Sequence, residues 1–204
     1  MDIAVNLVES YLRLSGYLTL SEFEVQRRAE FGYETVTDVD IMALRLPSAD
    51  SPCIPGSAEP CRPLILSDPV LMLSPDTIDV VIGEVKQGAA EFNPGITRHE
   101  VLHTMLRRVA WLYEEPVEDV VSGLQQRMVR ATPARGGGTV RTRLVAFGRA
   151  PQCDLHTISL SHIVRTVLAF FAETGDAFTP MQFRDPAPAM LALLMKTGFE
   201  VRKD

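Results

Sequence analysis

The run Ile78-Asp-Val-Val-Ile-Gly-Glu-Val-Lys86 constrains the fold more than any other part of the chain. Its interior is almost entirely apolar and rich in β-branched residues, which is typical of a β-strand covered by other layers on both faces. A strand of this kind lies inside a sheet rather than at its edge. We therefore expect 78–86 to be the central strand of the protein.

The segments around this strand predict an α/β fold with a mixed sheet flanked by helices. Apolar residues recur at helical spacing in several stretches, and Thr97 is a suitable N-cap for one of them. The expected helices cover 2–14, 97–113, 114–126, 157–173 and 185–198, and the other expected strands cover 17–27, 34–46 and 140–147. The resulting order is αβββαβ, with extra helices at the C-terminal end.

A chain of 204 residues can bury one substantial core, so a single domain over 1–204 is expected. Its core is expected over 2–150, with 151–204 as a helical extension packed on that core. Seven prolines between Pro47 and Pro75 predict an ordered or half-ordered insertion at 47–77 rather than a flexible linker.

Apolar runs in this sequence are too short to span a membrane, and the first residues lack the basic start and cleavage site of a secretory signal. We therefore expect a cytoplasmic protein without membrane contact. The three cysteines, Cys53, Cys61 and Cys153, are an odd number, and the first two are too widely spaced for a zinc knuckle. All three are expected to be free thiols.

Charged residues occur in pairs on two of the expected strands. Residues two apart on a strand share a face, so Asp38 and Asp40 point one way, and Glu84 and Lys86 share a face of the next strand. Burial at the end of an apolar strand penalises a charge that is neither paired nor bound to a metal. Two carboxylates from neighbouring strands can hold Mg²⁺, and a lysine beside the ion can orient an attacking water and offset charge on phosphorus. This is the chemistry that phosphodiester hydrolysis requires.

Two runs of sequence carry a family resemblance. Thr37-Asp-Val-Asp-Ile-Met-Ala-Leu44 and Val81-Ile-Gly-Glu-Val-Lys-Gln87 resemble the D…E-x-K signature of the PD-(D/E)XK nuclease superfamily. The resemblance covers about residues 2–150, includes the order of elements, and extends to Glu9, which matches an acid that many members carry on the preceding helix. The insertion after the second strand is longer than is usual in the family, and a Gln-x-x-x-Tyr motif is not visible. These departures leave the branch of the superfamily undefined.

The resemblance implies a restriction-endonuclease-like core and a metal-dependent nuclease, with DNA as the expected substrate. Asp40 and Glu84 would bind Mg²⁺ or Mn²⁺. Lys86 would act on the water, and Glu9 would assist. A homodimer or a partner protein would help to target the enzyme, because no helix-turn-helix or zinc finger accompanies the core. The alternative is a catalytically inactive subunit of a larger complex that keeps the same fold and binds or supports other components.

Basic residues are distributed unevenly along the chain. Residues 1–97 hold 6 basic and 15 acidic side chains (−9), and residues 98–204 hold 14 and 11 (+3), which together give the net charge of −6. The sharpest excess is a stretch without any acid, formed by Arg127, Arg130, Arg135, Arg141, Arg143 and Arg149. Such a stretch forms either a solvated face or an anion-binding edge. For a nuclease we expect phosphate contacts from Arg135, Arg141, Arg143 and Arg149.

The segment His99-Glu100-Val101-Leu102-His103 spells H-E-x-x-H, the motif of zinc metalloproteases. A zinc hydrolase is therefore a further alternative. The two histidines lie beside the apolar stripe of the expected helix, however, and no glycine follows at the spacing typical of these enzymes. We expect this segment to be a solvated helical face, with a position near the substrate groove as a second interpretation. His162 is expected to be an ordinary core or rim histidine.

Overall fold

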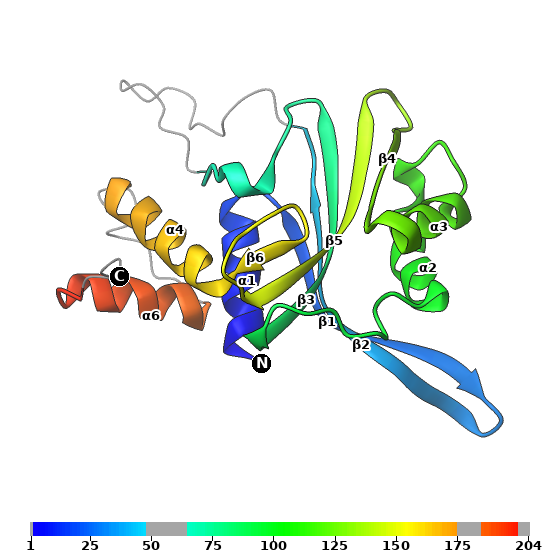
Figure 1. The fold of residues 1–204 in the computed structure, drawn as a ribbon, viewed down its shortest axis with the longest axis horizontal. Coiled ribbons are helices and arrows are strands. Elements are labelled where there is room, and N and C mark those ends of the chain that lie inside the picture. Colours follow the sequence, from blue (N-terminus) through cyan, green and yellow to red (C-terminus); the bar gives the residue numbers. More distant parts are fainter. Residues whose placement is uncertain (1, 48–64, 175–184, 200–204) are drawn as a thin grey trace.

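The computed structural model describes residues 2–47, 65–174 and 185–199 of the chain. These residues form an α/β fold in which a mixed, curled sheet is flanked by five helices (Figure 1). The strands are β1 (Leu18–Ala29), β2 (Gly32–Arg45), β3 (Thr77–Ala89), β4 (Val129–Pro133), β5 (Thr139–Arg149) and β6 (Thr157–Ser159). The helices are α1 (Ile3–Leu14), α2 (His99–Arg107), α3 (Val117–Arg127), α4 (Leu160–Glu173) and α6 (Pro186–Lys196), with short 3₁₀ turns η1 (Pro69–Leu71) and η2 (Ala110–Leu112). Within the described ranges, no helix has the length and apolar character that crossing a bilayer requires.

β3 lies inside the sheet, as its apolar sequence predicts. The order of strands is β1-β2-β3-β5-β4, with β6 paired to β5. The first three strands form an antiparallel series, whereas β5 runs parallel to β3. The chain connects these two parallel strands through α2, α3 and β4. The expected order of helix, three strands, helical connection and strand is therefore confirmed.

Helices cover both faces of the sheet (Figure 1). α1, α4 and α6 share a hydrophobic core with one face, and α2 and α3 share a second core with the other. Successive side chains of β3 alternate between the two cores. Val81 and Val85 belong to the first core, and Val80 and Ile82 belong to the second. This burial on both faces explains why β3 is apolar along most of its length.

β1 and β2 form a hairpin that extends beyond the rest of the sheet (Figure 1). Pairing between β2 and β3 ends at Ile41 and Gly83, whereas β1 and β2 remain paired out to Ala29 and Gly32. Gly32 has a φ of 100°, a left-handed conformation that suits glycine and closes the two-residue turn. The distal half of the hairpin is therefore a two-stranded ribbon.

The helix expected over 97–113 is shorter in the structure. α2 ends at Arg107, the single turn η2 follows, and Tyr113 then forms a β-bridge to Ala134. Thr97 does not cap this helix, because its N-cap is Arg98 and the Thr97 hydroxyl donates to the Pro94 carbonyl at 3.1 Å. The expectation for this segment was thus right in type and wrong at both ends.

Two short strands were not expected. β4 lies between the helix expected over 114–126 and the strand expected over 140–147, and β6 occupies the first residues of the helix expected over 157–173. Both pair with β5, β4 in the antiparallel and β6 in the parallel sense. With five and three residues, these strands are too short to show a clear alternation of apolar and polar residues.

Most of the insertion expected at 47–77 lies outside the described residues, as do Cys53 and Cys61. Its described end contains η1, which Asp68 caps by accepting a hydrogen bond from the Val70 N–H at 3.0 Å. Cys153 is a free thiol, as expected.

Candidate functional site

Asp40 and Glu84 lie where the ladder between β2 and β3 opens. The last antiparallel pair is Ile41 with Gly83, so one further step would set Asp40 directly opposite Glu84. The strands separate there, and Asp40 Oδ2 accepts a hydrogen bond from the Val85 N–H at 2.7 Å in place of a backbone carbonyl. The two carboxylates expected to act together are thus held next to each other by the sheet itself.

The hairpin changes its buried face at the same position. Ile41 packs in the core under α1, yet Val39, two residues earlier on the same strand, packs in the core under α2 and α3. On β1, Glu22 lies between the partners of these two residues and has a φ of 51°. A non-glycine residue in the left-handed region costs on the order of 1 kcal/mol, and such residues gather at functional sites. Local backbone strain therefore coincides with Asp40.

Glu84 is buried, and only one of its two oxygens has a partner. Its Oε1 forms an ion pair with the Lys86 ammonium, whose side chain is 44% exposed. Its Oε2 has no hydrogen-bond partner among the described residues. Buried carboxylate oxygens are normally satisfied, so an oxygen of this kind indicates a position at which a further positive group can bind.

The electrostatics of the pair lead to the same conclusion. Burial raises the pKa of Glu84, and the neighbouring Asp40 carboxylate raises it further, against the opposing effect of Lys86. Burial also raises the pKa of Asp40, although the Val85 N–H and Lys86 oppose this. The hydrogen bond to Glu84 raises the pKa of the Lys86 ammonium, which stays charged at neutral pH. A cation bound between the carboxylates would offset the repulsion from Asp40 that raises the pKa of Glu84.

Asp40 and Glu84 suit Mg²⁺ or Mn²⁺, which need few protein ligands, better than an ion that must be held entirely by protein ligands. In the part of the chain that the structure describes, no group of three or more His, Cys, Asp or Glu side chains could hold a metal. Mg²⁺ is commonly bound by one or two carboxylates and completes its shell with waters and substrate phosphates. Asp40 and Glu84 match that requirement, and the open Glu84 oxygen is the observation that supports it.

Glu9 is not brought to this pair. Its Oε1 accepts from Arg13, Thr19 and Ser21 at 2.6, 2.9 and 3.1 Å, and the carboxylate is satisfied there. Thr19 and Ser21 pair with residues of β2 that face α1, whereas Glu84 alternates with β3 residues on that face and so points to the other side. The ion pair with Arg13 accounts for Glu9, and the expected assisting role does not fit the structure.

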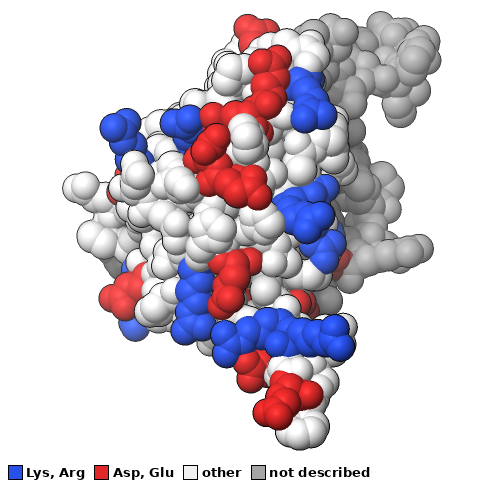
Figure 2. Space-filling model, turned by 90° about the vertical axis from the view of Figure 1, so that its right-hand side faces the viewer, with Lys and Arg blue, Asp and Glu red and all other residues white. Residues whose placement is uncertain are grey.

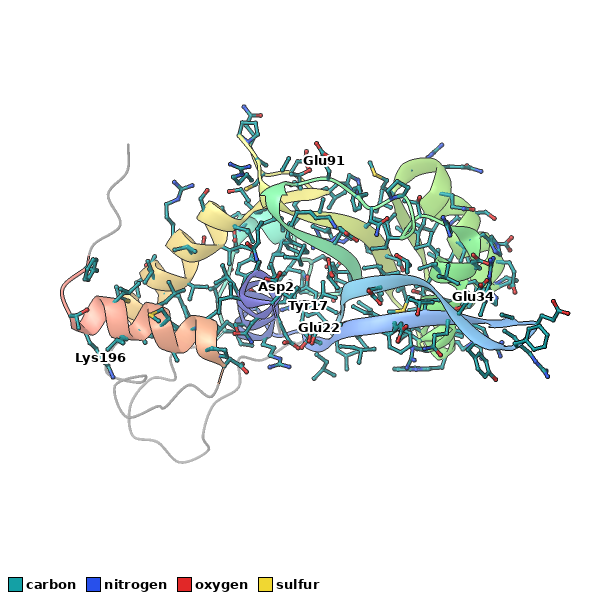
Figure 3. The ribbon with its side chains drawn as sticks, turned by 90° about the horizontal axis from the view of Figure 1, so that it is seen from below. Asp2, Tyr17, Glu22, Glu34, Glu91 and Lys196 are labelled. Atoms are coloured by element: carbon teal, nitrogen blue, oxygen red, sulfur yellow. The ribbon has the colours of Figure 1, made fainter. Side chains whose placement is uncertain are left out.

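Asp2 is an acid near the site that sequence reasoning missed. It is the N-cap of α1, accepts from Gln87 of β3 at 3.2 and 3.3 Å, and adds to the effects that raise the pKa of Asp40 after burial. Its backbone N–H lies 3.4 Å from the Glu22 carboxylate, and Figure 3 shows the two residues close together. The sequence marks Asp2 only as a helix cap, because its proximity to β3 depends on how α1 packs on the sheet.

The arginines expected to contact phosphate have different surroundings. Arg143 is fully buried and donates to Asp79 at 3.0 and 3.3 Å, and Arg141 donates to the other Asp79 oxygen at 2.6 Å. The expected phosphate contact is therefore wrong for Arg143, which a phosphate cannot reach, and does not fit Arg141, which the same carboxylate holds. Arg149 is exposed, and Arg135 donates to the Tyr113 carbonyl at 3.0 Å.

The face that carries α2 and α3 shows Lys and Arg interspersed with Asp and Glu, not one continuous basic patch (Figure 2). On α2 the His99 and His103 rings stack with their centroids 5.9 Å apart. His103 Nε2 lies 3.1 Å from Glu118 of α3. Val101 and Leu102 between them are fully buried, so the histidines lie beside the apolar stripe as expected.

No family model, characterised protein or solved structure matches this chain. The site itself offers one buried carboxylate, Glu84, one partly buried carboxylate, Asp40, and one ammonium group at the open end of a β-ladder.

Proposed function

We propose that this chain is a Mg²⁺- or Mn²⁺-dependent nuclease of the PD-(D/E)XK type, and that DNA is its substrate. The observation that carries the proposal is the buried Glu84 Oε2 beside Asp40, which has no hydrogen-bond partner within the described residues. The order of elements supports it, because an antiparallel series of three strands leads through helices to a parallel fourth strand. A restriction-endonuclease-like core is part of the same proposal.

Each residue has a defined role in this proposal. Asp40 and Glu84 hold the ion, which when bound would activate water and offset negative charge on the phosphate. Lys86 brings its ammonium group from the solvent to the Glu84 carboxylate, where it orients the attacking water and stabilises charge that develops on the phosphoryl oxygens. The Val85 N–H fixes Asp40 in position by its hydrogen bond.

A catalytically inactive subunit with the same fold is the second candidate. This candidate is supported by the Glu84–Lys86 ion pair, in which Lys86 satisfies one Glu84 carboxylate oxygen without a metal ion or substrate. In that case the pair is a structural contact, and its loss would cost at most about 1 kcal/mol of stability because Lys86 is partly exposed.

Replacing Lys86 with alanine separates the two candidates. We expect Lys86→Ala to lower the rate of DNA cleavage in Mg²⁺ by about a hundredfold to a thousandfold, because it removes a charge beside the reacting water but no metal ligand. Mg²⁺ binding, measured by calorimetry, should remain. Asp40→Ala should weaken Mg²⁺ binding as well as cleavage.

Lys196→Ala is the matched control, because Lys196 is in the last turn of α6, well away from Asp2, which lies near the site (Figure 3). It should cleave at the wild-type rate. A Lys86→Ala protein that also cleaves at that rate would remove the nuclease role from these residues. A wild-type protein that cleaves no nucleic acid in Mg²⁺ or Mn²⁺ would favour the inactive subunit.

A further inference from the structure

β1 is a long edge strand. It has 12 residues, stands at one end of the strand order and pairs with β2 alone among the described strands. An edge of this length presents a row of backbone N–H and C=O groups that can pair with another chain. Natural edges are protected by shortness, by covering elements, by charges or by bulges. Because β1 is long and charged, the order of its charges decides whether a partner strand can pair with it.

The apolar residues that β1 exposes are grouped at its two ends. Leu18 and Leu20, at the start of the strand, are 68% and 39% exposed. Phe31, in the turn just beyond its other end, is 93% exposed. If a second β1 ran antiparallel to the first, the hairpin tip of each copy would approach the leucines of the other. Both apolar groups would then be covered at once.

The charges of β1 are ordered by sign. The acids Glu22 and Glu24 precede the bases Arg27 and Arg28 along the strand. Glu24 and Arg28 are both exposed. The register of β1 and β2 shifts between Val25 and Gln26, but the extra residue, Val36, is on β2, so alternation along β1 continues and sets Glu24 and Arg28 on one face with Gln26 between them. Arg27 is already paired with Glu34 across the hairpin, whereas Arg28 makes no ion pair within the described residues. The strand therefore carries the acid Glu24 and the base Arg28 at equal distances from Gln26.

The charges of two β1 strands complement each other in an antiparallel pair but not in a parallel pair. An antiparallel pair centred on Gln26 sets Glu24 of each copy opposite Arg28 of the other, and opposite charges across a strand pair are stabilising. A parallel pair in register would place like charges together. The two Glu24–Arg28 pairs thus favour the same antiparallel pairing that covers Leu20 and Phe31, and they offset the approach of Glu22 to Glu30 in the turn of the other copy.

We propose that β1 pairs with β1 of a second copy of this chain, antiparallel and centred near Gln26, in a two-fold symmetric dimer. Every contact is made twice in such an interface, because residues of one copy meet their counterparts in the other. The two sheets become continuous across the dimer. The pairing involves neither Asp40 nor Glu84 nor Lys86, so it stands apart from the proposed function.

A charge exchange tests this pairing. Sedimentation equilibrium of the full chain over about a hundredfold range of concentration should show a monomer–dimer equilibrium. Glu24→Arg and Arg28→Glu should each weaken the dimer by about tenfold or more, because two attractive pairs become repulsive. The double variant Glu24→Arg with Arg28→Glu restores opposite charges and should dimerise like the wild type.

Glu91→Arg is the matched control, since Glu91 is exposed and lies on another part of the molecule from the hairpin (Figure 3). It should dimerise normally. Circular dichroism checks that each variant is folded, which the exposure of both positions leads us to expect. The proposal is overturned if the wild type stays monomeric throughout, if the single variants dimerise unchanged, or if the folded double variant does not recover.

Discussion

Two buried acids of β3, Asp79 and Glu84, have opposite surroundings. Asp79 accepts from Arg141, Arg143 and the Tyr17 hydroxyl. Glu84 has Lys86 on one oxygen and no described partner on the other. Burial alone would raise the pKa of both, but the arginines hold the pKa of Asp79 below its ordinary value, whereas that of Glu84 is raised. Asp79 is thus a satisfied structural carboxylate, and Glu84 is one that a ligand would complete.

The raised pKa of Glu84 leads to a prediction about stability. A buried carboxylate that prefers to be neutral contributes little to the folded state at neutral pH, so Glu84→Gln should leave the Tm within about 3 °C of the wild type or raise it. The same change should abolish Mg²⁺ binding, because a metal ligand is lost. Thermal melts in EDTA and calorimetric Mg²⁺ titration measure the two effects. A large drop in Tm together with unchanged Mg²⁺ binding would identify Glu84 as a structural residue.

Replacement of Arg143, in contrast to that of Glu84, should strongly destabilise the fold. Arg143→Ala leaves Asp79 buried with fewer partners, and breaking a buried ion pair from one side typically costs about 3–5 kcal/mol. The control is Arg149→Ala on the same strand, which removes an exposed guanidinium and should cost no more than about 0.5 kcal/mol. Urea denaturation of both variants gives the comparison. Equal stability of the two would mean that the Asp79 network does not hold the fold.

The sequence could not reveal this role of Arg141 and Arg143. Their spacing of two shows that they share a strand face, but not that the face is interior. Their partner Asp79 lies 62 and 64 residues earlier in the chain, next to them only because β3 and β5 are paired. The proximity of Asp40 and Glu84 could be predicted, because each carries a charge into an apolar strand and neighbouring strands bring such charges together.

Among the elements, the sequence predicts those in which apolar residues recur with a clear helical or strand periodicity. β3 and α1 appear where their apolar residues place them, because each buries a long face. The end of α2 and the short strands β4 and β6 were missed, because their limits are set by pairing with β5 and by the bridge from Tyr113. Contacts of this kind join distant segments and leave no local signal.

For α2 we predict that the H-E-x-x-H segment does not bind zinc stoichiometrically. His103 is directed to Glu118 on α3, and a zinc hydrolase needs a third protein ligand with an open position, for which the described residues offer no group. Metal analysis of the purified protein is the measurement. One equivalent of zinc that disappears in His99→Ala would contradict this expectation.

Across the whole molecule, two buried carboxylates connect the layers. Asp68, next to η1, accepts from Tyr11 of α1 and interacts with His162 of α4, each at 2.6 Å. Asp79 joins β3 to β5 through Arg143, which also donates to the Leu71 carbonyl of η1 at 3.4 Å. The segment that carries η1 is thereby fastened to the sheet and to two helices by hydrogen bonds that require ionised acids.

These contacts make the fold sensitive to acid. Burial alone would raise the pKa of Asp79 and of Asp68, but the arginines beside Asp79 outweigh it, as do the hydrogen bonds that Asp68 accepts, and both pKa values fall below the ordinary 3.8. A depressed pKa contributes stability that is complete above the unfolded value, near 4, and is lost as pH falls through the folded value. The free energy of unfolding should therefore stay level near neutrality and decrease steadily below about pH 4.

Asp79→Asn should be less stable than the wild type at pH 7, because Arg143 loses its counter-charge, and should lose less stability on acidification. Urea denaturation from pH 7 to pH 3, with the exposed Glu91→Gln as control, measures the difference. If Asp79→Asn lost stability between these pH values as steeply as the control, the acid sensitivity would have to arise from other carboxylates, and the Asp79 network could not be what fastens the layers together.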